Sequence, residues 1–114
     1  MSSSTCNWPL PNGQTMTFHV YNSDANWLEA GGLYIFSYLA KDGWFPLYVG
    51  QTENFSTRLP NHERLNEAVQ RGATHIHAVH VPQAGKRDEL ERLLIQHLQP
   101  TLNEQHKGLR QFAR

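Results

Sequence analysis

The hydrophobic pattern of this chain is dominated by two apolar and aromatic runs that a short polar turn separates. The runs cover residues 33–39 and 46–49, and the segment between them includes Lys-Asp-Gly at 41–43. Two strand-like runs joined through an Asp-Gly turn predict a β-hairpin. Alternation along the first run leaves both of its faces largely apolar, so we expect the hairpin to be buried.

Further strands are predicted on either side of the hairpin. In residues 15–21 apolar and polar side chains alternate, which indicates a half-buried strand. Residues 74–81 form a third core strand, and Pro82 ends it. Residues 1–7 are polar, and the stretch 8–13, with its prolines and glycine, is typical of a turn.

Two helices complete the predicted elements. Thr57 is placed to cap a helix that runs to Arg71, with Pro60 at its third position, where the missing N–H has no helical partner. Asp88 begins a second helix, because Asp88 and Glu91 have the spacing of a capping box. The inward stripe of this second helix is expected to be apolar apart from one histidine: Leu90, Leu93, Leu94, His97 and Leu98.

This order of elements predicts a small α+β domain. We expect a three-stranded antiparallel core sheet flanked by helices, with an extra N-terminal strand. The 114 residues are enough for one modest hydrophobic core. We therefore divide the chain into an N-terminal extension (1–31), a core (32–103) and a mobile C-terminal tail (104–114).

The charges of the chain are balanced overall but segregated along the sequence. Lysine plus arginine and aspartate plus glutamate number 10 each, so the chain lacks the positive charge typical of a free-standing nucleic-acid binder. Residues 1–53 carry one lysine against four carboxylates, whereas residues 54–114 carry nine basic and six acidic side chains. Any polyanion should therefore bind to the second half of the chain.

Cysteine usage and hydropathy bear on the compartment. The single Cys6 excludes an internal disulfide and a cysteine-rich zinc site, which fits a reducing compartment. No signal peptide, transmembrane run or lipidation signal is visible. We expect a soluble, intracellular protein, in the cytoplasm, with no membrane partner.

A few polar side chains are candidates for chemistry. Arg58 and His62 are four residues apart and share a face if the helix holds through Pro60. An arginine fork suits a phosphate, and a histidine can move a proton. Glu91 borders the apolar stripe of the second helix, where a carboxylate can ligate a hard cation. The simpler interpretations are a surface pair, a helix cap and, for Asn103, a turn residue.

Histidines also crowd the third core strand. His75 and His77 share one face of that strand, and His80 lies close in sequence, so the three could begin a transition-metal site. No cysteine is nearby, and further ligands are not apparent. Polar surface histidines are therefore the preferred interpretation over a structural zinc.

The candidate residues and the ends of the hairpin resemble the motifs of the GIY-YIG nuclease superfamily. This superfamily includes homing endonucleases, some restriction enzymes and the N-terminal domain of a bacterial excision-repair nuclease. Gly32-Leu33-Tyr34 and Tyr48-Val49-Gly50 look like its two name-giving tripeptides, and each places a phenol beside a glycine, where another backbone or a phosphate could approach. The remaining landmarks follow in the family's order and spacing, so the resemblance spans residues 32–103: Arg58, His62, Glu91, Pro100 and Asn103.

Two positions depart from the family pattern. Gln51 stands where some members carry a lysine, which removes one phosphate-facing charge. Pro60 falls within the helix that is expected to present Arg58 and His62, and a late helix start would hold these two side chains less firmly.

The resemblance implies a divalent-metal-dependent endonuclease that hydrolyses phosphodiester bonds in DNA. Glu91 would bind one Mg²⁺, or Mn²⁺, which would keep most of its ligands as water and substrate oxygens. Arg58 would clamp the phosphate. Either Tyr34 or His62 would take the proton from the attacking water. The family picture favours Tyr34, whereas an unperturbed histidine titrates closer to neutral pH.

The resemblance also assigns supporting roles and a partner. Tyr48 and Asn103 would orient water, base or phosphate, and Arg58 would contact DNA. Outside the resemblance, the basic charges of the tail are expected to add DNA contacts through Lys107 and Arg110. Most of the chain is committed to the core, so sequence specificity should come from DNA shape, self-association or a partner protein. The alternative function is a catalytically inactive nucleic-acid-binding or protein-interaction module on the same fold.

Overall fold

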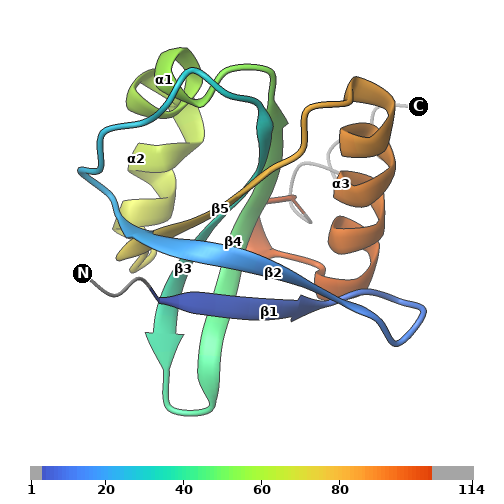
Figure 1. Ribbon diagram of the computed structural model, residues 1–114. Helices are drawn as coiled ribbons and strands as arrows, with labels where there is room; N and C mark the ends of the chain where they lie inside the picture. Colours follow the sequence, from blue (N-terminus) through green and yellow to red (C-terminus); the bar gives the residue numbers. More distant parts are fainter. Residues whose placement is uncertain (1–3, 104–114) are drawn as a thin grey trace, which may run out of the picture.

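The computed structural model describes residues 4–103 of the chain, and one five-stranded antiparallel sheet forms its centre (Figure 1). The strands lie in the order β1-β2-β5-β3-β4. They are β1 (Thr5–Pro9), β2 (Thr15–Asn22), β3 (Gly32–Ala40), β4 (Gly43–Thr52) and β5 (His75–His80). The α+β composition agrees with the sequence, but the predicted three-stranded core sheet is wrong.

The N-terminal strands explain this difference. β2 was predicted as an extra strand, yet it pairs with β5 over four positions, with His19 opposite Ala78. β1, which the sequence assigned to loose and turn-forming residues, pairs with β2 along its whole length. Pro9 closes β1 at the edge of the sheet, where a residue without an N–H is tolerated. Trp8 is 4% exposed, so its burial fixes this short strand.

The hairpin and the strand at 74–81 are confirmed. β3 and β4 form the hairpin, with a register shift between Phe36 and Ser37 opposite Pro46. β4 starts at Gly43, earlier than the apolar run indicated. β5 lies between β2 and β3 and therefore connects the N-terminal strands to the hairpin.

The helices lie on both faces of the sheet (Figure 1). In the described residues they are α1 (Phe55–Arg58), the 3₁₀ turn η1 (Leu59–Asn61), α2 (Glu63–Gln70) and α3 (Ala84–Leu98). One core cluster joins α1, η1 and α2 to the sheet: Tyr34, Phe36, Leu47, Phe55, Leu59, Ala68, Ile76, Ala78 and Leu102. The other joins α3 to the opposite face: Trp8, Leu10, Phe18, Leu33, Ile35, Val49, Val81 and Leu94.

The prediction of a single helix over residues 57–71 is wrong, because the helical segment is interrupted at a proline. α1 begins after Asn54, whose side chain accepts a hydrogen bond of 2.9 Å from the N–H of Ser56. Pro60 lies in η1, and the backbone then turns extended at His62, with ψ 125°. A proline disfavours a continuous α-helix around it, so His62 becomes the cap of a second helix rather than a residue within one.

The second predicted helix also begins elsewhere. α3 starts at Ala84, one turn before the predicted cap Asp88. Its first turn is fixed by the buried side chain of Arg87, which donates a hydrogen bond of 3.0 Å to the carbonyl of Val81. His97, which was placed in the inward stripe, is exposed. The leucines of that stripe pack on the sheet as predicted.

Two hairpin glycines lie where no side chain fits. A Cβ on Gly50 would come within 2.5 Å of the hydroxyl oxygen of Tyr34. A Cβ on Gly32 would overlap the carbonyl oxygen of Val79 on β5. The close approaches at these glycines are therefore made by a tyrosine ring of the same hairpin and by the neighbouring strand.

None of the helices in residues 4–103 is both long and apolar enough to cross a membrane. The tail predicted over 104–114, with Lys107 and Arg110, lies outside the described residues.

Candidate functional site

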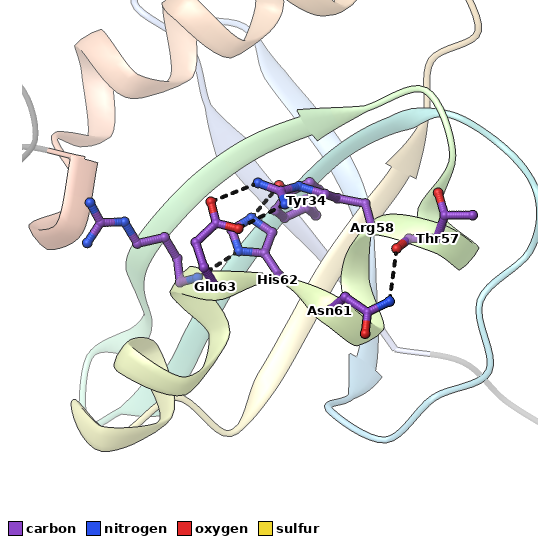
Figure 2. Close-up of polar contacts among 7 residues, drawn as sticks. Tyr34, Thr57, Arg58, Asn61, His62 and Glu63 are labelled. Atoms are coloured by element: carbon purple, nitrogen blue, oxygen red, sulfur yellow. Dashed lines mark hydrogen bonds and ion pairs between the residues drawn. The ribbon is translucent and has the colours of Figure 1, made fainter.

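The centre of the candidate site is a hydrogen bond between Tyr34 on β3 and His62 at the start of α2 (Figure 2). The phenol oxygen and Nε2 of the imidazole are 2.7 Å apart, and both side chains are buried. The Nδ1 of His62 accepts a hydrogen bond of 3.0 Å from the backbone N–H of Arg64. A neutral His62 therefore carries its proton on Nε2 and donates it to the phenol oxygen of Tyr34.

Burial keeps both members of this pair uncharged near neutral pH. Burial, with a smaller contribution from the positive charge of Arg58, lowers the pKa of His62 to about 4. Burial also raises the pKa of Tyr34 above its usual range, although the nearby Arg58 guanidinium opposes this shift. The site thus holds a neutral imidazole against a protonated phenol.

Arg58 ends α1, and its guanidinium lies beside the Tyr34–His62 pair (Figure 2). Both terminal nitrogens donate to the carboxylate of Glu63, over 2.9 Å and 3.2 Å. This bond with Arg58 lowers the pKa of the Glu63 carboxyl to about 2. Arg58 therefore already holds a planar anion in the two-pronged geometry that a phosphate would use.

Glu91 reaches the site from α3, on the other side of the hairpin. Gln51 at the end of β4 donates to Glu91 over 3.0 Å and also donates to Asp88. Burial raises the pKa of the Glu91 carboxyl, the bond from Gln51 opposes this, and the charge of Asp88 adds to it. Glu91 lies close enough to raise the pKa of Tyr34 as well. Within the described structure, no lysine or arginine side chain is bonded to the carboxylate of Glu91, so its negative charge has no positive partner there.

Tyr48 on β4 completes the aromatic lining. Its ring centre lies 6.4 Å from that of Tyr34 and 5.3 Å from that of His62. Burial raises its pKa, so this phenol is also protonated. Tyr48 borders a cavity of about 310 Å³ beside the site, together with residues of α2 and Asn103: Glu63, Arg64 and Glu67.

Asn103 is buried and forms two hydrogen bonds with the backbone of Val49. Its side-chain oxygen accepts from the N–H of Val49 over 2.7 Å, and its side-chain nitrogen donates to the carbonyl of Val49 over 3.1 Å. Both polar groups of the amide are thus engaged by the residue next to Tyr48. Asn103 holds the strand that carries Tyr48.

The structure therefore brings Tyr34, Tyr48, Arg58 and His62 together. Glu91 lies on the other side of the hairpin, where its charge still acts on Tyr34 and Tyr48. Asn103 lines the cavity beside Tyr48 and holds the backbone of β4. Sequence reasoning missed the partner of Arg58, Glu63, and noted Gln51 only as a departure from the family pattern. The order Arg-x₄-Glu, with a proline between, could have indicated Glu63. Gln51 gave no local signal, because its partners lie on a helix 37 and 40 residues away.

One histidine of β5 differs from the surface interpretation, whereas His75 is half-buried and His80 is exposed. His77 is 0% exposed, and its Nδ1 accepts a hydrogen bond of 2.9 Å from the indole N–H of Trp8. The Nδ1 of His80 bonds with the carbonyl of Gly31. Within residues 4–103 no three His, Cys, Asp or Glu side chains gather into a group that could hold a metal ion. His75, His77 and His80 thus do not converge.

Comparison of the chain with protein-family models, with curated proteins and with solved structures found no match.

Proposed function

We propose that this chain is a divalent-metal-dependent endonuclease of the GIY-YIG type, which hydrolyses phosphodiester bonds in DNA. The observation that carries the proposal is that a phenol, an imidazole and a guanidinium from separate elements meet, with the carboxylate of Glu91 near enough for its charge to act on the same phenol. Tyr34 comes from β3, Arg58 and His62 from the segments around η1, and Glu91 from α3. These groups supply what phosphodiester hydrolysis requires: a base, a phosphate clamp and a cation ligand.

The donor set near Glu91 fits a hard cation. Its nearest polar neighbours are the carboxylate of Asp88 and the amide of Gln51, whose side-chain nitrogen donates to both carboxylates. Two carboxylates and no sulfur suit a hard cation, which would displace the amide nitrogen of Gln51. The pKa of Glu91 is raised by burial and by Asp88, so a divalent cation would relieve an unfavourable negative charge. Glu91 would hold Mg²⁺ or Mn²⁺. When bound, the cation would supply positive charge for the phosphate and for nearby oxygen groups.

The remaining groups have roles that follow from their bonds. The phenol of Tyr34 first loses its proton to solvent, and the phenolate then takes a proton from the water that attacks phosphorus, as the P–O bond breaks and the leaving oxygen takes a proton from solvent. The guanidinium of Arg58 favours this phenolate and opposes the effect of burial. His62 donates its Nε2 proton to the phenol oxygen and thereby favours the phenolate. Arg58 exchanges Glu63 for the phosphate and stabilises the charge that develops on it. Tyr48 lines the site beside them.

The first test removes the candidate cation ligand. We expect Glu91→Ala to abolish cleavage of supercoiled plasmid and branched DNA in Mg²⁺, while its circular dichroism spectrum and its DNA affinity in Ca²⁺ stay close to those of the parent protein. Glu89→Ala is the matched control, because Glu89 is exposed on the same helix. Cleavage by Glu91→Ala at the parent rate would refute the metal assignment.

The alternative, an inactive binding module, is favoured by one specific observation. In the described structure Arg58 and Glu91 are each already bonded, to Glu63 and Gln51. A module that only binds would retain DNA affinity and show no Mg²⁺-dependent cleavage of any substrate. The same plasmid and branched-DNA assay, run across Mg²⁺ and Mn²⁺, separates the two functions.

A further inference from the structure

A second cavity, of about 520 Å³, lies on the α1–α2 side of the sheet beside β2. Aromatic and apolar side chains dominate its wall, and two histidines line it: Tyr21, Trp27, Leu28, Phe55, His19 and His80. The Tyr21 and Trp27 rings meet edge to face at 5.0 Å, and the Trp27 and Phe55 rings lie 5.9 Å apart. Tyr21 is 40% and Leu28 77% exposed, so apolar surface at its mouth faces solvent.

The charges around this cavity are negative. Residues 1–40 contain no lysine or arginine, and the connection from β2 to β3 that forms one wall carries the exposed Asp24 and Glu29. Glu53, also exposed, lies two residues before Phe55. An aromatic cavity with carboxylates nearby and no cation in its lining complements an apolar group flanked by positive charges.

We propose that this cavity binds residues 104–114 of the chain itself. That segment reads Glu-Gln-His-Lys-Gly-Leu-Arg-Gln-Phe-Ala-Arg, with one acidic and three basic side chains. Phe112 is the ring that enters the cavity, and Arg110 and Arg114 flank it. The guanidinium groups then lie near Asp24 and Glu29, so the charges on the two sides match.

The segment has the reach that this arrangement requires. Leu102 packs in the same core cluster as Phe55, so the segment starts on the face of the sheet that carries the cavity. Asn103 is held on β4, and three inter-strand spacings separate β4 from β2, or about 15 Å. Phe112 follows Asn103 by nine residues, which extend up to about 30 Å. The segment is therefore long enough to span the strands that separate β4 from β2.

The inference stands apart from the proposed nuclease function, and it is tested by NMR on the ¹⁵N-labelled full-length chain. We expect positive heteronuclear NOEs for residues 110–113, which report restricted fast motion. Phe112→Ala should make these NOEs negative and shift the Trp27 indole resonance. The matched control is Gln111→Ala, which removes a neighbouring side chain without the ring and should change neither signal.

Reciprocal variants test the wall of the cavity. Tyr21→Ala should release the segment as Phe112→Ala does, with the amide spectrum of the sheet otherwise retained. The double variant Asp24→Asn, Glu29→Gln should release it at a lower salt concentration than the parent protein. Positive NOEs that depend on protein concentration would place the segment of one copy in the cavity of another, which also supports the proposal.

Two outcomes would overturn it. Negative NOEs throughout 104–114 in the parent protein, with a Trp27 resonance that Phe112→Ala leaves in place, would show that the segment does not bind there. A thymidine dodecamer that shifts the Trp27 resonance, with the shift lost in Tyr21→Ala and Phe112 without effect, would assign the cavity to a nucleobase.

Discussion

His62 receives the backbone N–H of Arg64 on Nδ1, so the proton of the neutral imidazole lies on Nε2, facing Tyr34. An imidazole with this tautomer cannot take the phenol proton, because its acceptor nitrogen is already engaged. Its pKa of about 4 also leaves it uncharged at neutral pH. The geometry therefore supports Tyr34 as the base and His62 as the residue that orients and stabilises it.

We predict that Tyr34→Phe lowers the single-turnover rate of DNA cleavage by about 10²- to 10⁴-fold, the usual size of a general-base contribution. His62→Asn, which keeps a side-chain acceptor for the Arg64 N–H, should have a smaller effect. Tyr38→Phe is the control, because Tyr38 lies on the same strand and stacks on Phe45 outside the site. Near-full activity of Tyr34→Phe, with strong loss in His62→Asn, would reverse the assignment.

At this scale the sequence indicated which residues gather but not how they are bonded. Tyr34, Arg58 and Glu91 were identified through their types and spacing. The tautomer of His62 depends on the extended backbone at that residue, and the pairing of Arg58 depends on where α2 begins. Both are set by the break at the 3₁₀ turn. The tautomer left no signal in the sequence, and only the proline between Arg58 and Glu63 hinted at their pairing.

At the scale of elements, the β3–β4 hairpin carries the two tyrosines of the site, Tyr34 and Tyr48. The Tyr34 ring lies over Gly50 of the neighbouring strand, and Cβ at that position would overlap the ring. The Tyr34 ring can therefore pack against β4 only because residue 50 has no side chain.

We predict that Gly50→Ala lowers the melting temperature by several degrees and reduces cleavage, because either the tyrosine ring or β4 must move. Gly85→Ala, on the first turn of α3, is the matched control, since a Cβ there meets nothing within 4 Å and its backbone is helical. That change should be neutral or slightly stabilising. Differential scanning calorimetry of the two variants measures both effects, and a Gly50→Ala protein as stable as the parent would contradict this packing.

The elements that a local sequence pattern defines were predicted well. The elements that depend on contacts with distant parts of the chain were not. The hairpin carries its turn and its apolar runs in one continuous stretch, so the sequence sufficed. β1 is short, polar and ends in proline, and it exists as a strand only because β2 pairs with it and Trp8 is buried. Likewise α3 begins before its apparent cap because a buried arginine fixes its first turn.

For the whole molecule, two buried histidines on opposite faces of the sheet govern stability in acid. His62 lies in the α1–α2 face and His77 under Trp8 on the α3 face, and the pKa of each is lowered to about 4, mainly by burial. In the unfolded chain each titrates near its ordinary value of about 6.5. Between these pH values the unfolded state binds more protons than the folded state.

We therefore predict that the free energy of unfolding is constant between about pH 7 and about pH 9 and falls as the pH drops from about 6.5 to about 4, by on the order of 3 kcal/mol for each of the two histidines. Urea unfolding at a series of pH values measures this slope. His62→Asn should remove part of it, whereas His97→Gln, at an exposed position on α3, should leave it unchanged. A flat profile between pH 4 and pH 7 would contradict the burial of both rings.

The number of strands shows which part of the overall fold could not be predicted from the sequence. The composition and element order gave an α+β domain, but the join between β2 and β5 pairs residues more than 50 positions apart, such as His19 with Ala78. Such pairing depends on the assembled core and leaves no local pattern. The sheet therefore has two more strands than the predicted three-stranded core sheet: β2, which was predicted as an extra strand, and β1, which was not predicted as a strand.

The two hydrogen bonds between Asn103 and Val49 have a consequence for the order of events during biosynthesis. A ribosome releases β3, β4 and the histidine cap well before Asn103, and the early segments can begin to pair as they emerge. The backbone beside Tyr48 gains these two bonds only when residue 103 has left the exit tunnel. A nascent chain thus carries an unfinished site throughout most of its synthesis, and a translation pause before this asparagine would prolong that state.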